Sequence, residues 1–90
     1  GLALSYLNRK EDAIKAYDAL IQKFSNETDT AIKQNVAWAM KNKGVALSNL
    51  KRYDDAIKAY DACIQKFSNE TDIEIQKIIK EAREKRDKLR

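Results

Sequence analysis

Residues that could carry out chemistry are few in this chain of 90 residues, which has one cysteine, Cys63, and no histidine. Without histidine, acid–base chemistry near neutral pH would require carboxylates or lysines with shifted pKa values. The acidic pairs Glu11–Asp12 and Asp54–Asp55 stand together at expected helix starts, where carboxylates favour the positive end of the helix dipole. A metal site of the Cys/His kind lacks its ligands. The sequence therefore predicts no enzyme, no catalytic residue, no metal site and no cofactor.

The distribution of charge and hydropathy limits the partners. Residues 77–90 hold seven basic and three acidic side chains, and their net charge of +4 equals the net charge of the whole chain. No aromatic residue lies among them to stack on bases, which disfavours a nucleic-acid partner. No apolar run approaches the roughly 20 residues of a membrane span, and no signal peptide pattern is present, although the chain starts at Gly1 without Met. We expect a cytoplasmic protein that does not bind a membrane.

The elements that position these residues are repeated. Residues 12–29 and 55–72 differ only at Leu20, which is replaced by Cys63. With an offset of 43, residues 1–28 and 44–71 are identical at 22 of 28 positions. Such identity indicates a duplicated structural unit.

Within each copy, the apolar residues follow the i, i+3, i+4, i+7 spacing of an amphipathic helix. Proline is absent, and glycine occurs only at positions 1 and 44, so little interrupts helices. A capping-box pattern, Thr71 and Glu74, indicates a helix from about Asp72. The expected elements are a truncated helix over 1–8 and helices over 10–24, 29–50, 53–67 and 72–89, with neighbours antiparallel.

The repeated residues resemble the tetratricopeptide repeat. The family's small glycine falls on Gly1 and Gly44, and its Tyr position falls on Leu4 and Leu47. Its Ala falls on Ala13 and Ala56, and its later aromatic residue falls on Tyr17 and Tyr60. The chain departs from the family pattern at three positions: the family's Trp falls on Met40, its Leu on Lys43, and its final Pro on Ser25 and Ser68. The repeat period of this chain is 43 residues, whereas that of the family is 34.

The resemblance implies an all-α fold of antiparallel helix pairs stacked as a short right-handed superhelical solenoid. The expected organisation is one domain, 1–90. It contains a partial first repeat at 1–28, a second repeat at 29–71 and a C-terminal capping helix at 72–90. We interpret the longer period as an extended variant of the repeat. The array begins in mid-unit, so either a longer array was cut or the apolar edge pairs with another chain.

The resemblance also implies that one stripe of the helix over 29–50 lines a concave groove that holds a peptide. The only tryptophan, Trp38, lies on this stripe, and an aromatic residue in a polar groove is a typical binding hot spot. The alternative is that Trp38 packs against a neighbouring helix. The predicted partner-binding residues are Trp38, Lys41, Asn42, Val45, Ser48, Asn49 and Tyr6.

Lys41 and Asn42 match positions where family members grip the C-terminal carboxylate of a peptide. A complete clamp is disfavoured, because Val45 stands where another Asn is needed and Glu81 stands where a Lys is needed. Lys85 supplies the only supporting charge, so a weaker preference for acidic peptides is expected.

The remaining repeated apolar side chains are assigned to the core. These are Tyr17, Tyr60, Phe24 and Phe67. Cys63 is expected to be an inert buried thiol, because no histidine or basic pocket is evident that would stabilise a thiolate.

Three functions follow from the sequence. The first is a protein-interaction module that binds a peptide or helix of an unidentified partner. The second is self-association as a homodimer, since the segment 1–8 carries Leu2, Leu4 and Leu7 without an obvious partner helix. The third, disfavoured, is binding of nucleic acid or an acidic surface by the basic helix at 77–90.

Overall fold

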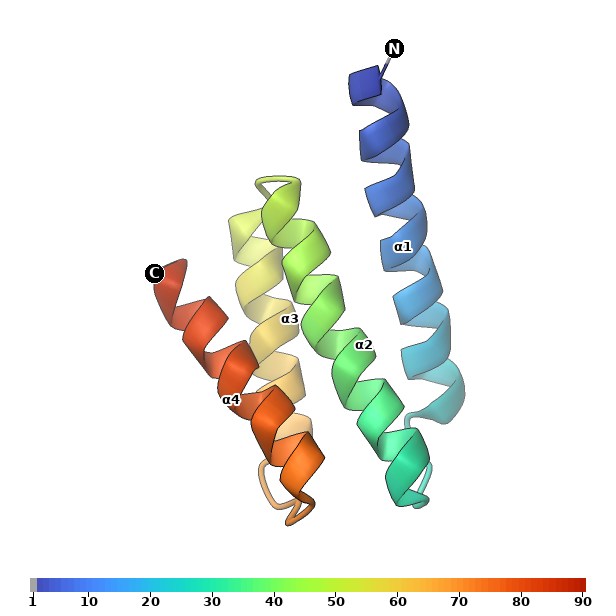
Figure 1. Ribbon diagram of the computed structural model, residues 1–90, viewed down its shortest axis with the longest axis vertical. Coiled ribbons are helices and arrows are strands. Elements are labelled where there is room, and N and C mark those ends of the chain that lie inside the picture. Colours follow the sequence, from blue (N-terminus) through green and yellow to red (C-terminus); the bar gives the residue numbers. More distant parts are fainter. Residues whose placement is uncertain (1) are drawn as a thin grey trace.

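A computed structural model describes residues 2–90 of the chain, with side chains from Asn8 onward. Over these residues the fold is all-α, with α1 (Leu2–Phe24), α2 (Thr30–Asn49), α3 (Tyr53–Lys66) and α4 (Ile73–Lys88), and no strand (Figure 1). None of the four described helices combines the length and apolar character needed to cross a membrane.

Side-chain caps determine where α2 and α4 begin. The carboxylates of Asp29 and Asp72 accept hydrogen bonds of 3.1 Å from the backbone N–H groups of Ile32 and Ile75, three residues later. Each bond satisfies one of the unpaired amides at the start of a helix. The expectation from the capping box was therefore one residue early, because Asp72 and not Thr71 is the cap.

The second helix is central to the molecule. α2 packs against α1, α3 and α4, and α3 also packs against α4. Figure 1 shows α2 and α4 side by side in front, with α3 behind them and α1 at the other edge of α2. Successive helices are antiparallel, so the described chain forms a short stack of helix pairs.

The core is built around Tyr60, whose side chain is only 2% exposed. Its ring lies against Gly44 of α2, where an added Cβ would be 2.4 Å from Cε1 of the ring. A side chain at position 44 would therefore separate α2 from α3. Phe67 and Cys63 are also buried, and Cys63 donates to the carbonyl oxygen of Ala37 at 3.6 Å.

The predicted core is thus confirmed at Tyr60, Phe67 and Cys63. Burial raises the pKa of the Cys63 thiol to about 11, which agrees with the inert thiol expected from the sequence. Tyr17 and Phe24, the counterparts of Tyr60 and Phe67, are only half-buried.

The turn between α2 and α3 has a defined hydrogen-bond pattern. Lys51 adopts a left-handed conformation with φ of 63°. The backbone N–H of Arg52 donates to the carbonyl oxygen of Leu47, and the N–H of Lys51 donates to that of Ser48, each at 2.9 Å. This is a Schellman motif, which satisfies the last carbonyl groups of α2 and reverses the chain.

The corresponding position in the first copy has the opposite conformation. Asn8 takes the place of Lys51, yet α1 continues through it from Leu2 to Phe24. The expected break between a helix over 1–8 and a helix over 10–24 was therefore wrong. In the second copy the turn is stabilised by α2, a helix of 20 residues packed on three others. In α1, by contrast, residues 2–7 are the part of the helix that precedes Asn8. The helical hydrogen bonds of the backbone therefore favour a continuous helix through Asn8.

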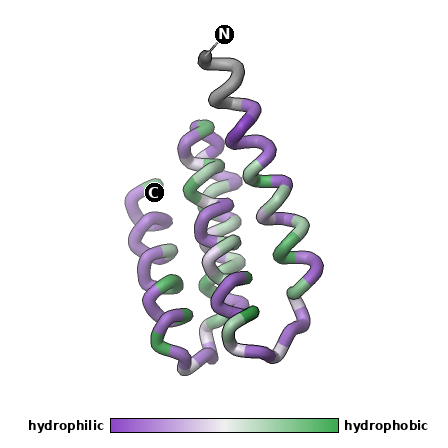
Figure 2. The backbone as a smooth tube through the Cα atoms, turned by 45° about the vertical axis from the view of Figure 1, so that its right-hand side comes forward, coloured by the Kyte–Doolittle hydropathy of each residue, from purple (hydrophilic) through white to green (hydrophobic). Residues whose placement is uncertain are grey.

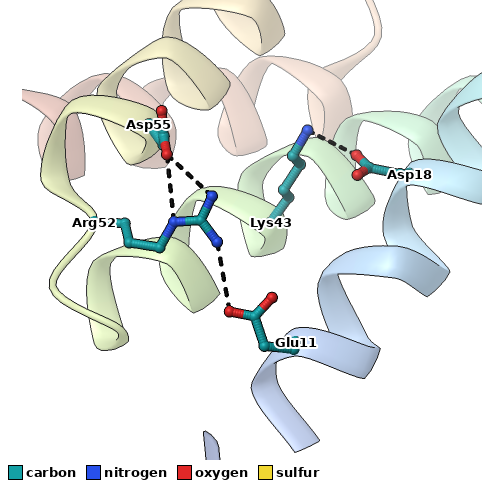
Figure 3. Close-up of polar contacts among 5 residues, drawn as sticks. All are labelled: Glu11, Asp18, Lys43, Arg52 and Asp55. Atoms are coloured by element: carbon teal, nitrogen blue, oxygen red, sulfur yellow. Dashed lines mark hydrogen bonds and ion pairs between the residues drawn. The ribbon is translucent and has the colours of Figure 1, made fainter. Parts of the chain in front are cut away.

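Ion pairs connect successive helix pairs at matching positions. Lys43 Nζ of α2 lies 2.7 Å from Asp18 Oδ1 of α1 (Figure 3). One repeat later, 43 residues along the chain, Arg86 Nη1 of α4 lies 2.8 Å from Asp61 Oδ1 of α3. Both partners are displaced by the same 43 residues, so α1 packs on α2 in the register in which α3 packs on α4.

α4 has one apolar face and one polar face. Figure 2 shows this helix as mainly hydrophilic, with its hydrophobic residues concentrated in the first half. Ile75, Ile79 and Ala82 are buried against the stack, whereas Ile73 is 68% exposed. α4 therefore covers the core with one face and presents charged side chains on the other.

The contact between Gly44 and Tyr60 predicts the effect of a single methyl group. We expect Gly44→Ala to lower the free energy of unfolding by about 1–3 kcal/mol, because overpacking outweighs the helix propensity of alanine. Combining it with Tyr60→Leu should make the cost of Gly44→Ala smaller than in the wild-type background. Urea unfolding measures both. Asn49→Ala, at an exposed position of the same helix, is the control; an equal or raised stability of Gly44→Ala would contradict the packing.

Candidate functional site

The candidate site is the groove between α2 and α4, which consists of two open depressions. The first has a volume of about 340 Å³ and is lined by Gln34, Asn35, Trp38, Glu74 and Ile78. The second, of about 210 Å³, is lined by Val45, Ser48, Asn49, Tyr60, Lys85, Lys88 and Leu89. We refer to the two depressions together as the α2–α4 groove.

Trp38 lies at the edge of the first depression. Its side chain is 48% exposed, and its ring makes an edge contact with Tyr17 of α1, with 5.7 Å between ring centroids and 81° between planes. The two interpretations of Trp38 from sequence were thus not exclusive. One part of the indole packs against a neighbouring helix, and another part faces the groove.

An ion pair links α2 and α4 between the two depressions. Lys41 Nζ lies 2.7 Å from Glu81 Oε2, and the Lys41 side chain is only 14% exposed. The hydrogen bond and the charge of Lys41 lower the pKa of Glu81. Because Lys41 is already paired, its charge is not available as an isolated grip for a peptide carboxylate.

The remaining predicted partner-binding residues differ in their surroundings. Asn42 donates from Nδ2 to the carbonyl oxygen of Trp38 at 3.0 Å, a bond within the helix. Val45 and Ser48 are half-buried and Asn49 is exposed, and all three line the second depression. Tyr6 lies outside the residues whose side chains the structure describes.

On the α4 side of the groove, only Glu81 and Lys85 were considered from the sequence. Ile78 of α4 is half-buried and lines the first depression opposite α2. Lys88 in the second depression was not singled out. The offset of 43 could have indicated both residues, because it relates Ile78 to Asn35, which lines the first depression from α2, and Lys88 to the predicted binding residue Val45.

The start of α4 is connected to α2 by a polar contact. Gln34 Nε2 donates to Asp72 Oδ2 at 2.9 Å, and this bond, together with the capping bond from Ile75, lowers the pKa of Asp72. Lys33 Nζ also lies 2.7 Å from Glu70 Oε1 in the α3–α4 connection. These contacts hold the first turn of α4 beside the first turns of α2.

Among the side chains from Asn8 onward, no three His, Cys, Asp or Glu residues converge to hold a metal ion. The groove combines an exposed aromatic ring, two lysines and the aliphatic side chains of Ile78, Val45 and Leu89.

These helix pairs define an all-α helical-repeat fold. Two models of the tetratricopeptide repeat match the chain, one over residues 1–27 and the other over residues 37–69, and together they cover two thirds of it. The chain belongs to the tetratricopeptide repeat family. Proteins of this family generally mediate protein–protein interactions as non-enzymatic scaffolds. No curated protein and no solved structure matched the chain.

The position of Trp38 predicts its fluorescence. In dilute solution we expect ready quenching by acrylamide, because about half of the side chain is exposed. Tyr17→Ala removes the edge contact and should increase the quenching constant further. Tyr53→Ala, which removes an exposed aromatic side chain from α3, should leave it unchanged. A blue emission maximum that resists acrylamide would contradict the exposed position of Trp38.

The pair between Lys41 and Glu81 predicts a dependence of stability on pH. The pKa of Glu81 is lower in the folded protein than in the unfolded chain. The ion pair therefore stabilises the folded protein at pH values above the ordinary pKa of glutamate, and this stabilisation is lost as the pH falls through the lowered pKa of Glu81. The wild type should therefore be more stable than Lys41→Met at pH 7, and the difference should disappear at strongly acidic pH. Urea unfolding across this range tests it. Lys80→Met, at an exposed position of α4, is the control; a difference that persists in acid would exclude the pair as its cause.

Proposed function

We propose that this chain is a non-enzymatic interaction module that binds a segment of a partner protein along the α2–α4 groove. The observation that carries the proposal is the first depression, where the half-exposed ring of Trp38 and the side chain of Ile78 line an open volume of about 340 Å³. Aromatic side chains in such positions often contribute most of the affinity of an interface.

The chemistry of the groove indicates what the partner offers. The first depression suits an aromatic or aliphatic side chain, with Gln34 and Asn35 beside it to hydrogen-bond the peptide backbone. The second contains Lys85 and Lys88, which favour acidic side chains. Because Glu81 neutralises Lys41, the basic end of the groove depends on these two lysines.

The spacing of the two depressions sets the spacing in the partner. Trp38 and Val45 are seven residues apart on α2, which corresponds to ~10 Å along the axis. An extended peptide covers this distance in roughly three residues. The expected segment has an apolar anchor followed or preceded, about three to five positions away, by acidic residues.

A selection from displayed random peptides tests this proposal. We expect enriched sequences with that spacing, and we expect Trp38→Ala to weaken the best peptide at least about tenfold, as at a hot spot. Replacing Lys85 and Lys88 together by alanine should weaken binding and reduce its dependence on salt. Isothermal titration measures each affinity.

Tyr53→Ala is the matched control, since Tyr53 is an equally exposed aromatic residue on α3, 46% exposed and away from the groove. Its affinity should equal that of the wild type. Selected peptides that bind Trp38→Ala as tightly as the wild type would reject the groove as the binding site.

Two alternatives from the sequence have different support. Self-association is favoured by the half-buried state of Tyr17 and Phe24 on α1. Binding of nucleic acid or an acidic surface by residues 77–90 is weakened, because Arg86 contacts both Asp61 and Asp87 and is not a free charge. Cytoplasmic location remains a prediction from the sequence.

A further inference from the structure

α4 presents one stripe of side chains to the α2–α4 groove. Its members stand three or four residues apart, so they lie on one face of the helix. Two of them line the first depression, two line the second, and the middle one forms the ion pair with Lys41. In chain order, the stripe consists of Glu74, Ile78, Glu81, Lys85 and Lys88.

The repeat provides an internal reference for this stripe. One repeat earlier, the corresponding positions of α2 carry no charge; they are Ala31, Asn35, Trp38, Asn42 and Val45. In α4, four of the five positions are charged. The net charge of the groove therefore comes from α4, since Glu81 neutralises Lys41 of α2.

The charges of the stripe are separated by sign along the groove. Glu74 lies in the first depression, whereas Lys85 and Lys88 lie in the second. The ion pair that links α2 and α4 is neutral and lies between them. The groove is therefore acidic at its aromatic end and basic at its other end.

The helix dipole does not account for this order. A dipole favours acidic side chains near the start of a helix and basic ones near its end, on every face alike. The exposed charged residues of α4 outside the stripe have the opposite order, with three basic residues before two acidic ones; they are Lys77, Lys80, Arg83, Glu84 and Asp87. The separation of charge is thus a property of the stripe that faces the groove.

Both ends of the stripe are accessible to a charged partner. Glu74 Oε1 lies 3.7 Å from Lys77 Nζ, and both side chains are exposed, so this pair contributes little and opens readily. Lys85 and Lys88 are exposed, and among the side chains from Asn8 onward no carboxylate forms a salt bridge with either of them. Side chains of a partner can therefore reach all three charges.

We propose that the groove selects a partner segment by the order of its charges, with a basic residue on one side of the apolar anchor and acidic residues on the other side. The inference rests on the proposed function, to which it adds the basic residue and the order.

The stripe also sets the spacing of these charges. Glu74 precedes Ile78 by ~6 Å along the helix axis, and Lys85 and Lys88 follow Ile78 by ~10–15 Å. In an extended segment, the basic residue therefore stands roughly two positions from the anchor, and the acidic residues stand roughly three to five positions from it on the other side.

Synthetic peptides of identical composition test the order. Each contains two lysines, two glutamates and the apolar anchor that the displayed peptides prefer. In the separated peptide, the lysines stand on one side of the anchor and the glutamates on the other, whereas in the mixed peptide each side carries one of each. A mixed peptide stays mixed in either chain direction, so it cannot regain the order by binding in reverse.

We expect the separated peptide, in the better of its two chain directions, to bind at least about fivefold more tightly than the mixed peptide at low ionic strength. High salt should reduce this preference, because it screens the charges. Isothermal titration measures both affinities.

Neutralising the stripe tests whether α4 recognises the order. Glu74→Gln combined with Lys85→Gln and Lys88→Gln should bind the two peptides equally. The matched control neutralises the same number of charges of each sign outside the stripe and should keep the wild-type preference; its changes are Lys80→Gln, Arg83→Gln and Glu84→Gln. Circular dichroism verifies that both variants remain helical.

The basic residue has a test of its own, which needs only one substitution in the protein. Replacing the lysines of the separated peptide by glutamine should weaken binding to the wild type about threefold and leave binding to Glu74→Gln unchanged. Glu84→Gln should respond as the wild type does. An equal loss in Glu74→Gln would overturn the pairing of the basic residue with Glu74.

The outcomes separate this inference from the proposed function. Equal binding of the separated and mixed peptides, with both weakened by Trp38→Ala, overturns the charge order and leaves the groove in place. A preference that persists after the stripe is neutralised also overturns the charge order. If no peptide binds, or if Trp38→Ala binds every peptide as tightly as the wild type, the groove is rejected and the charge order with it.

Discussion

The close approach of Tyr60 to Gly44 sets the geometry from which the rest of the structure follows. Because position 44 has no side chain, the tyrosine ring reaches the backbone of α2, and α3 lies close enough to bury Ala56 and Cys63 completely. The short distance between these helices requires a tight reversal. Lys51 provides it at a cost of roughly 1–2 kcal/mol for its left-handed conformation, which the buried apolar surface of the pair offsets.

The same contact determines which residues of α2 are available for binding. Once Gly44 faces α3, helical geometry places Val36, Met40 and Leu47 in the core and turns Trp38 and Asn49 outward. α4 then packs against both α2 and α3 and forms the opposite wall of the groove. The pair between Lys41 and Glu81 links the two walls and lies between the aromatic end and the basic end of the groove.

The sequence predicted the parts of this structure that depend on local patterns and internal repetition. The helix pairs, the core position of Tyr60 and the buried thiol of Cys63 all follow from apolar periodicity and the offset of 43. The conformation at Asn8 did not follow, because asparagine accepts a left-handed turn more readily than lysine does, yet only Lys51 adopts it. Packing of the preceding helix decides between turn and helix there. The partner of Lys41 and the second contact of Trp38 depend on the rotation of helices about their axes, which a single sequence does not reveal.

The unusual length of the repeat is coupled to the groove. The family model matches from residue 37 onward, so the first turns of α2, residues 30–36, lie outside it. These turns supply Lys33 and Gln34, which contact Glu70 and Asp72 at the entry to α4. Asp72 thereby accepts bonds both from α2 and from the first turn of α4, and it ties the two helix starts together. Glu74 and Ile78 follow directly and stand opposite Trp38. A repeat of the ordinary length would lack these turns, and with them the contacts that hold this wall of the groove in place.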